Sequence, residues 1–273
     1  MSASSKRVLY VDHTAKASGG EIALFNLVNA LDKSRITPVF VLASDGPLAE
    51  KLRRVGIETH ILPLDGSVVD ARKDSLGLGS LLHLGKIRRT LGYAWRLSKI
   101  ARKLNIDLIH TNSLKADIYG GIAGRLARIP VIWHVRDNID SDYLPGTVAT
   151  AFRILARIIP SAVVANSQST LARLQIPGRN RRKAVVYSGI PSVDAGDRMH
   201  LVHDGLDINT FDPSTAGSSE LEADSDRSIV AIVGRIAQWK GQDVFLRAAA
   251  DVVTMFPKTR FWIIGAPLFG EDE

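Results

Sequence analysis

A basic loop near the end of the 273-residue chain has the residues needed to bind a diphosphate. A β-branched run at 229–233 stops at Gly234, and Arg235 and Lys240 then lie on a short loop before a helix-like segment. Arginine and lysine bind phosphate oxygens as charged hydrogen-bond donors. The spacing therefore predicts a clamp for a diphosphate group.

A glycine pair follows the first predicted strand and leads into a helix predicted at 21–31. Gly19 and Gly20 let backbone N–H groups approach an anion closely, and the N-terminus of the helix adds a favourable dipole. Glu21 suits that dipole or binds sugar hydroxyls; the alternative is a tight turn with an acid in the first helical turn. The spacing is not Gly-x-Gly-x-x-Gly and there is no Walker loop, so a standard dinucleotide or P-loop site is unsupported.

A second polar motif, His134-Val135-Arg136-Asp137, lies just beyond the strand predicted at 130–134. Ligands of open α/β sheets bind at the carboxyl ends of the strands. His134 could donate to a substrate oxygen and Arg136 could pair with an anion. The alternative is a histidine satisfied by the backbone and an Arg136–Asp137 pair at the surface.

Polar runs at 110–113, which includes Asn112, and at 166–169 end two more predicted strands. Such runs at consecutive strand ends are expected where a pocket faces the crevice of the sheet. Either run could equally cap the helix that follows it, Ser169 especially.

Short strands and helices alternate along the chain, which predicts βαβ units and a parallel sheet with helices on both faces. The strands are Val/Ile-rich and are predicted to be buried on both faces. They are expected at 7–12, 37–43, 58–62, 106–111, 130–134, 162–166 and 184–187, with helices at 21–31, 47–55, 86–105 and 169–174.

Composition limits the class of protein. There is no cysteine, so a disulfide framework or a thiolate metal site is excluded. No run approaches the length of a membrane span, and residues 1–6 are polar, which predicts a cytosolic protein. The net charge of +7 favours acidic partners such as nucleotides or anionic lipid surfaces. A nucleic-acid partner is not expected, because no recognised binding motif appears.

Residues 1–190 are predicted to form a Rossmann-like domain and 191–227 a polar connection, because Gly, Pro, Ser and acidic residues gather there. A strand–helix–strand pattern at 228–273 (229–233, 242–255 and 259–264) predicts the start of a second α/β domain.

Taken in order, the motifs resemble those of the large retaining glycosyltransferase family 4. The ordered set is Gly19-Gly20-Glu21, His110-Thr111-Asn112, His134-Val135-Arg136-Asp137, Asn166-Ser167-Gln168-Ser169, a hinge-like 203–211 with Asp204 in place of the usual Asn, and Gly234-Arg235 with Lys240-Gly241.

The resemblance implies a GT-B architecture of two Rossmann-like domains and transfer of a sugar with retained anomeric configuration, as in a retaining hexosyltransferase. The donor would be a UDP- or GDP-linked sugar, the acceptor a glycan or a lipid-linked molecule, and no metal or cofactor would be required. The resemblance also assigns roles, which are stabilisation of the leaving diphosphate for Arg235 and Lys240, donor-sugar contact for His134, phosphate contact for Gly19 and Gly20, and the acceptor side for Glu21, Asn112 and Arg136.

Two departures from the family pattern bear on activity. A Glu-x₇-Glu pair expected in the second domain is not supplied after Gly265, and residues 191–200 read as an insertion before the hinge. We therefore expect a chain truncated within its C-terminal domain, with little or no transfer activity. The alternative function is a non-catalytic module that binds a nucleotide or an anion at a membrane surface.

The helix predicted at 86–105 is strongly basic. Its residues from Lys86 to Lys103 include seven basic residues and no acid. Leu91 and Leu97 are expected on one broad apolar face, and Trp95 among the basic residues on the other. This pattern is typical of a peripheral membrane helix, and the alternative is a solvated helix packed on the sheet. The basic residues are Lys86, Arg88, Arg89, Arg96, Lys99, Arg102 and Lys103.

Overall fold

The computed structural model describes residues 5–64, 80–139, 144–177, 182–187, 228–234, 236 and 240–265. The chain divides into two compact units, Met1–Ile208 and Asn209–Glu273. The connection predicted at 191–227 lies outside the described residues.

The first unit is built on a seven-stranded parallel sheet of order β3-β2-β1-β4-β5-β6-β7. This architecture confirms the predicted α/β class. The order shows that the chain winds outward from β1 in one direction and then from β4 in the other. The strands are β1 (Lys6–Asp12), β2 (Ile36–Leu42), β3 (Glu58–Ile61), β4 (Leu108–Thr111), β5 (Val131–Val135), β6 (Ala162–Ala165) and β7 (Arg182–Val185).

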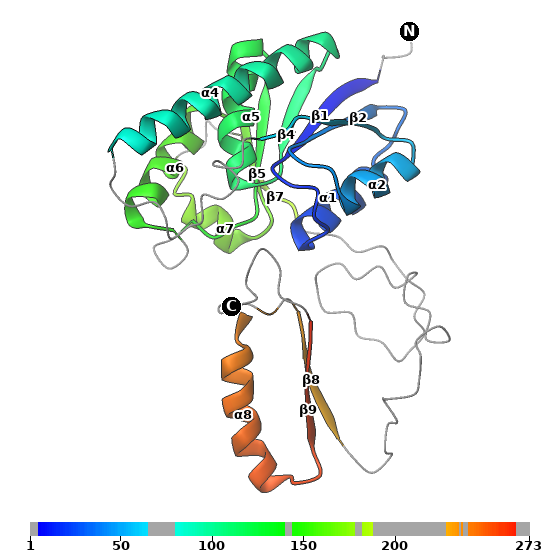
Figure 1. Ribbon diagram of the computed structural model, residues 1–273, viewed down its shortest axis with the longest axis vertical. Coiled ribbons are helices and arrows are strands. Elements are labelled where there is room, and N and C mark those ends of the chain that lie inside the picture. Colours follow the sequence, from blue (N-terminus) through cyan, green and yellow to red (C-terminus); the bar gives the residue numbers. More distant parts are fainter. Residues whose placement is uncertain are drawn as a thin grey trace. The chain divides into compact units, whose positions relative to one another are not determined.

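Helices cover both faces of this sheet, because its central strands are apolar on both sides. On one face, α1 (Gly19–Asn29) and α2 (Pro47–Arg54) pack through residues such as Leu24 and Leu52 (Figure 1). On the other face lie α4 (Ser80–Lys103), α5 (Leu114–Ala127) and α6 (Gly146–Ile158) (Figure 1). The short helix α7 (Gln168–Arg173) lies between β6 and β7 in the chain.

Helix α5 approaches the sheet unusually closely. A Cβ built on Gly124 would lie 2.1 Å from Cγ2 of Val131 and 3.0 Å from the carbonyl oxygen of Ile129. Gly120 and Gly121 meet neighbouring side chains at 2.6 and 2.5 Å in the same way. The glycines are therefore needed for close packing, and this packing sets the position of the N-terminus of α5 at the carboxyl edge of the sheet.

Gly124→Ala is expected to destabilise the chain by about 1–3 kcal/mol, because the added methyl group overpacks α5 against β5. Gly92→Ala is the matched control, since a Cβ on this glycine of α4 has no neighbour within 4 Å. The control should raise stability by about 0.5–1 kcal/mol through the lost flexibility of glycine. Urea unfolding measures both changes, and equal effects of the two substitutions would contradict the close packing of α5.

Helix α4 packs on the sheet through Tyr93, Ala94, Leu97 and Ala101, which are fully buried. Leu91 was expected on this packed face, but its side chain is 48% exposed. The reason is that α4 packs against α5 as well as on the sheet, so that its buried stripe is turned away from Leu91. Among the described residues, no helix is long and apolar enough to span a membrane.

The described part of the second unit contains β8 (Ile229–Val233), α8 (Gln242–Met255) and β9 (Arg260–Ile264), with the two strands parallel. The bounds of β8 and α8 are those predicted from the sequence. Several large apolar side chains of this unit are more than half exposed: Val233, Val244, Leu246, Met255 and Phe256.

Candidate functional site

Polar side chains gather at the carboxyl edge of the first sheet, where β1, β4 and β5 end. Neighbouring strands β1 and β4 are separated by about a hundred residues of chain, and the winding direction reverses between them. A crevice at such a reversal is where ligands of open α/β sheets bind. Asp12 ends β1, Asn112 directly follows β4, and His134 lies one residue before the end of β5.

Asn112 joins three of these segments. Its Nδ2 donates to Oδ2 of Asp12 at 2.7 Å and to the carbonyl of Gly20 at 3.3 Å, while its Oδ1 accepts from Nε of Arg136 at 2.8 Å. The side chain of Asn112 is buried, and both ends of its amide are occupied by these partners. Asn112 therefore orients Arg136 and the glycine pair at the start of α1.

Asp12 and His13 are further members of the site that the sequence motifs did not single out. Oδ1 of Asp12 accepts from the backbone N–H of His13 at 2.7 Å and from the hydroxyl of Ser113 at 3.1 Å. Nδ1 of His13 lies 3.0 Å from the same oxygen and 2.9 Å from Oγ of Ser113. The only sequence signal was an acid and a histidine at the end of the first strand, which has no distinctive spacing.

Gly19 and Gly20 are the first two residues of α1, whose opening N–H groups have no partner within the helix. A Cβ on Gly20 would lie 3.6 Å from Cδ of Arg136, so the arginine lies against the start of α1. Glu21 is buried, and its Oε2 accepts hydrogen bonds from the backbone N–H and the hydroxyl of Ser18. This is the first-turn capping role that was the alternative for Glu21. Burial, followed by the charge of Asp12, raises the pKa of Glu21.

Asp12, His13 and Glu21 form the one group, within the described ranges, whose atoms could ligate a metal ion; the three atoms lie within 4.8 Å of one another. Their oxygen and nitrogen atoms already take part in the hydrogen bonds above. The expectation that no metal is required stays a prediction.

His134 faces His110 across the β4–β5 pair. Nδ1 of His134 lies 3.1 Å from Nε2 of His110, and the ring centroids are 5.3 Å apart. Burial, with a smaller effect of the Arg136 charge, lowers the pKa of His110 to about 3 and that of His134 to about 2. Both rings are therefore neutral at ordinary pH.

Asp117 lies behind this edge, in the first turn of α5, and is fully buried. The hydroxyl of Thr111 contacts its Oδ1 and also the carbonyl of Ile132 at 3.2 Å. Burial raises the pKa of Asp117 well above its ordinary 3.8. The charges of Asp137 and Asp12 add to this rise, because a further negative charge close to them is unfavourable.

The run at 166–169 has a capping role, as its alternative interpretation predicted, but the cap is two residues earlier than expected. Ser167, not Ser169, precedes α7, and its hydroxyl accepts from the backbone N–H of Thr170 at 3.0 Å. Asn166 donates to the carbonyl of Arg136 at 3.2 Å and so supports the loop after β5.

In the second unit, Lys240 is exposed and directly precedes Gly241, which caps the N-terminus of α8 with a left-handed φ of +79°. Gly234, at the carboxyl end of β8, donates its N–H to the carbonyl of Ile264 at 2.9 Å. Lys240 therefore stands at the positive end of a helix dipole, which is a favourable place for an anion. Arg235 lies outside the described residues.

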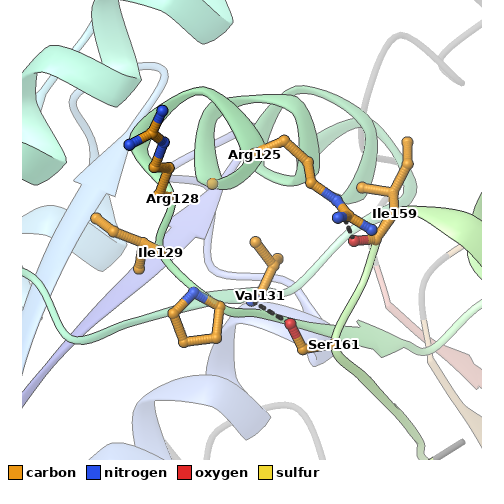
Figure 2. Close-up of a pocket in the computed structure, with 8 residues that line it drawn as sticks. Arg125, Arg128, Ile129, Val131, Ile159 and Ser161 are labelled. Atoms are coloured by element: carbon orange, nitrogen blue, oxygen red, sulfur yellow. Dashed lines mark hydrogen bonds between the residues drawn. The ribbon is translucent and has the colours of Figure 1, made fainter.

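A pocket of about 320 Å³ lies elsewhere, at the amino end of β5 (Figure 2). Arg125 points across it and donates its Nε to the carbonyl of Ile159 at 3.1 Å, and Val131 donates its N–H to Oγ of Ser161 at 3.4 Å (Figure 2). The guanidinium of Arg125 therefore satisfies carbonyls at the end of α6, which is a structural role. The pocket is separate from the polar residues at the carboxyl edge.

The fold matches solved glycosyltransferase structures. The crystal structure of Anabaena HepE in complex with UDP and glucose superposes with a TM-score of 0.66 at 24% identity, over 97% of this chain and 62% of that chain. The HepE complex with UDP-glucose gives a TM-score of 0.67 at 23% identity, over the same shares of the two chains. The seven-stranded parallel sheet of the first unit, together with the second α/β unit, thus matches the GT-B fold of glycosyltransferases.

The model of Glycosyltransferase Family 4 matches residues 17–192, which is more than half of the chain, and the chain belongs to this family. A D-inositol 3-phosphate glycosyltransferase of a Mycobacterium species (strain KMS) is 39% identical over 72 residues, which are 26% of this chain and 16% of that relative. A D-inositol 3-phosphate glycosyltransferase of a Nocardioides species is 25% identical over 170 residues, 60% of this chain and 35% of that relative. The aligned part therefore covers well under half of these curated relatives.

Proposed function

We propose that the protein transfers a sugar from a nucleotide-sugar donor to a glycan or lipid-linked acceptor, with retention and without a metal or cofactor. The observation that carries this proposal is the polar group at the carboxyl edge of the first sheet, in which His134, Arg136 and the start of α1 come together. Membership of Glycosyltransferase Family 4 and the UDP and UDP-glucose complexes of HepE support a nucleotide-sugar donor.

The roles follow from charge and position. Lys240 and Arg235 bind the leaving diphosphate, and the helix dipole at Lys240 adds to their charge. His134 contacts the donor sugar, and the first N–H groups of α1 at Gly19 and Gly20 bind a phosphate oxygen. Arg136 lies on the acceptor side. Asn112 and Glu21 act there by holding Arg136 and the start of α1 in place, since their polar atoms already have partners.

Two measurements test this function. UDP or GDP should raise the melting temperature of the chain, because a ligand that binds only the native state stabilises it. Release of nucleoside diphosphate from a UDP- or GDP-sugar, with transfer to an acceptor, separates an enzyme from the alternative non-catalytic nucleotide- or anion-binding module. If neither nucleotide stabilises the chain, the result contradicts both the proposed enzyme and the alternative nucleotide-binding module.

The 273-residue chain by itself is proposed to transfer sugar slowly or not at all. The support is the second unit, whose described elements leave Val244, Met255 and Phe256 more than 60% exposed. Exposed apolar surface of this kind is unfavourable in water. Helix α8, which begins just after Lys240, is therefore only weakly stabilised by packing. Transfer by the purified chain of confirmed mass, at rates typical of enzymes, would overturn this part of the proposal.

We also propose that α4 binds an anionic membrane surface through an apolar ridge of Ile87, Leu91 and Trp95. These side chains follow one another at intervals of four residues and are 55%, 48% and 53% exposed. Nζ of Lys99 lies 3.6 Å from the centre of the Trp95 ring. Exposed basic residues with no acid nearby on the helix surround the ridge, which matches the charge of acidic lipid headgroups. A lipid-linked acceptor would be presented at such a surface.

Cosedimentation with phosphatidylglycerol vesicles tests this surface. The Leu91→Ser/Trp95→Ser variant should bind at least about tenfold more weakly than the parent chain, because burial of two large apolar groups is lost. Val55→Ser is the control, since Val55 is equally exposed at the end of α2, on the other face of the sheet. Equal binding to phosphatidylcholine vesicles, or unchanged binding by the double variant, would reject α4 as the membrane surface.

A further inference from the structure

His134, the buried histidine of the candidate site, has a hydrogen-bond partner at one ring nitrogen and none at the other. Nδ1 of His134 lies 3.1 Å from Nε2 of His110, whereas Nε2 of His134 is buried and has no hydrogen-bond partner in the structure. A buried polar atom without a partner carries a desolvation cost, which a ligand oxygen can relieve. His134 therefore presents a single, defined nitrogen to whatever binds at this edge.

His110 is itself held in a fixed orientation. Its ring lies 5.0 Å from the ring of Tyr10 at an angle of 35°, and Tyr10 stacks in turn on Phe40 at 5.2 Å. These three rings stand side by side on β4, β1 and β2, because Tyr10 is in register with both Phe40 and His110. The sheet thus fixes Nε2 of His110 against Nδ1 of His134.

Only one hydrogen can lie between the two rings, and its position decides what His134 offers to a ligand. Because both rings are neutral, each carries a hydrogen on one nitrogen only. If Nε2–H of His110 donates, then Nε2 of His134 carries the other hydrogen and is a donor. In the reverse case, Nε2 of His134 is an acceptor. The hydrogen bond made by one nitrogen sets the state of the other.

We propose that His110 is a positioning residue, which donates its Nε2–H to Nδ1 of His134 and so holds His134 as a hydrogen-bond donor toward an oxygen of the donor sugar. This rests on the proposed function. Every oxygen of a nucleotide sugar accepts hydrogen bonds, but only its hydroxyls donate them, so an N–H at Nε2 suits any of those oxygens. His110 acts through His134 and needs no contact with the substrate.

The tautomer of His134 can be measured in the ligand-free chain by ¹⁵N–¹H NMR, independently of any activity. We expect the Nε2–H form of His134 in the parent chain. His110→Phe keeps the stacked ring but removes the donor, and it should convert His134 to a mixture of tautomers. His110→Gln keeps an N–H donor near the position of Nε2 and should restore the Nε2–H form. An Nδ1–H form of His134 in the parent chain would overturn the proposal.

Binding of UDP and of UDP-glucose then tests the link to the sugar. His110→Phe should weaken UDP-glucose binding about tenfold and leave UDP binding unchanged, with partial recovery in His110→Gln. Equal weakening of both ligands would show a general structural role and would overturn the positioning role. If the parent chain binds neither nucleotide, the proposed function fails, while the tautomer measurement still decides the state of His134.

Discussion

Lys240→Ala is expected to lower kcat for sugar transfer by about 10² or more, measured in a version of the protein whose second domain has the length of its relatives. Removing a fixed charge at a leaving group usually costs a factor of this size, because the stabilisation is present only when charge develops in the transition state. The N-terminal position of Lys240 beside α8 adds the helix dipole to its charge, and the alanine variant keeps only the dipole.

Lys258→Ala is the matched control for charge. Lys258 is also exposed, but it follows the opposite end of α8, about 20 Å from Lys240 along a 14-residue helix. The same loss of one positive charge there should leave kcat within about a factor of two. Equal losses in the two variants would point to a general effect of net charge, and an unchanged kcat in Lys240→Ala would show that the clamp assignment is wrong.

Periodicity located most of the strands, because a buried parallel strand is a short β-branched run between polar breaks. Strand β8 has the bounds that were predicted, and β5 is shifted by only one residue. Helix α5 was not among the predicted elements. It contains Gly120, Gly121 and Gly124, which weaken a helical pattern in sequence but are required for close packing in the fold.

The sequence placed His134, Arg136 and Asn112 at strand ends, yet it could not reveal what they contact. Asp12 and Asn112 are 100 residues apart in the chain, and only the pairing of β1 with β4 brings them together. The contact between His110 and His134 likewise depends on the register of β4 and β5. Strand order and register are tertiary properties, so a single sequence predicts the position of the site better than the function of each side chain within it.

The helical periodicity of α4 predicted most of its buried stripe, and Leu91 is the exception. Leu97 is buried and Trp95 exposed as expected, whereas Leu91 shares the exposed surface with Trp95. A helix that packs on both a sheet and a neighbouring helix buries a stripe set by that contact geometry, which a helical projection does not contain.

Asn112→Leu is expected to lower the free energy of unfolding by about 3 kcal/mol, although leucine has the same number of side-chain heavy atoms and the same branching as asparagine. The substitution leaves Oδ2 of the fully buried Asp12 without its amide donor and Nε of Arg136 without its acceptor. Leaving a buried charged group unpaired costs more than the hydrogen bond itself contributes. Urea unfolding of the 273-residue chain measures the loss without any need for activity.

Two further variants make this result specific to the network. Asn29→Leu, at an exposed position near the end of α1, should change stability by less than about 0.5 kcal/mol. In an Asp12→Asn background, the loss caused by Asn112→Leu should shrink, because the side chain whose Oδ2 loses its amide donor is no longer a charged carboxylate. If both backgrounds lose the same amount, Asn112 contributes through packing alone, and the hydrogen bonds that join β1, β4 and β5 do not determine the stability of this edge of the sheet.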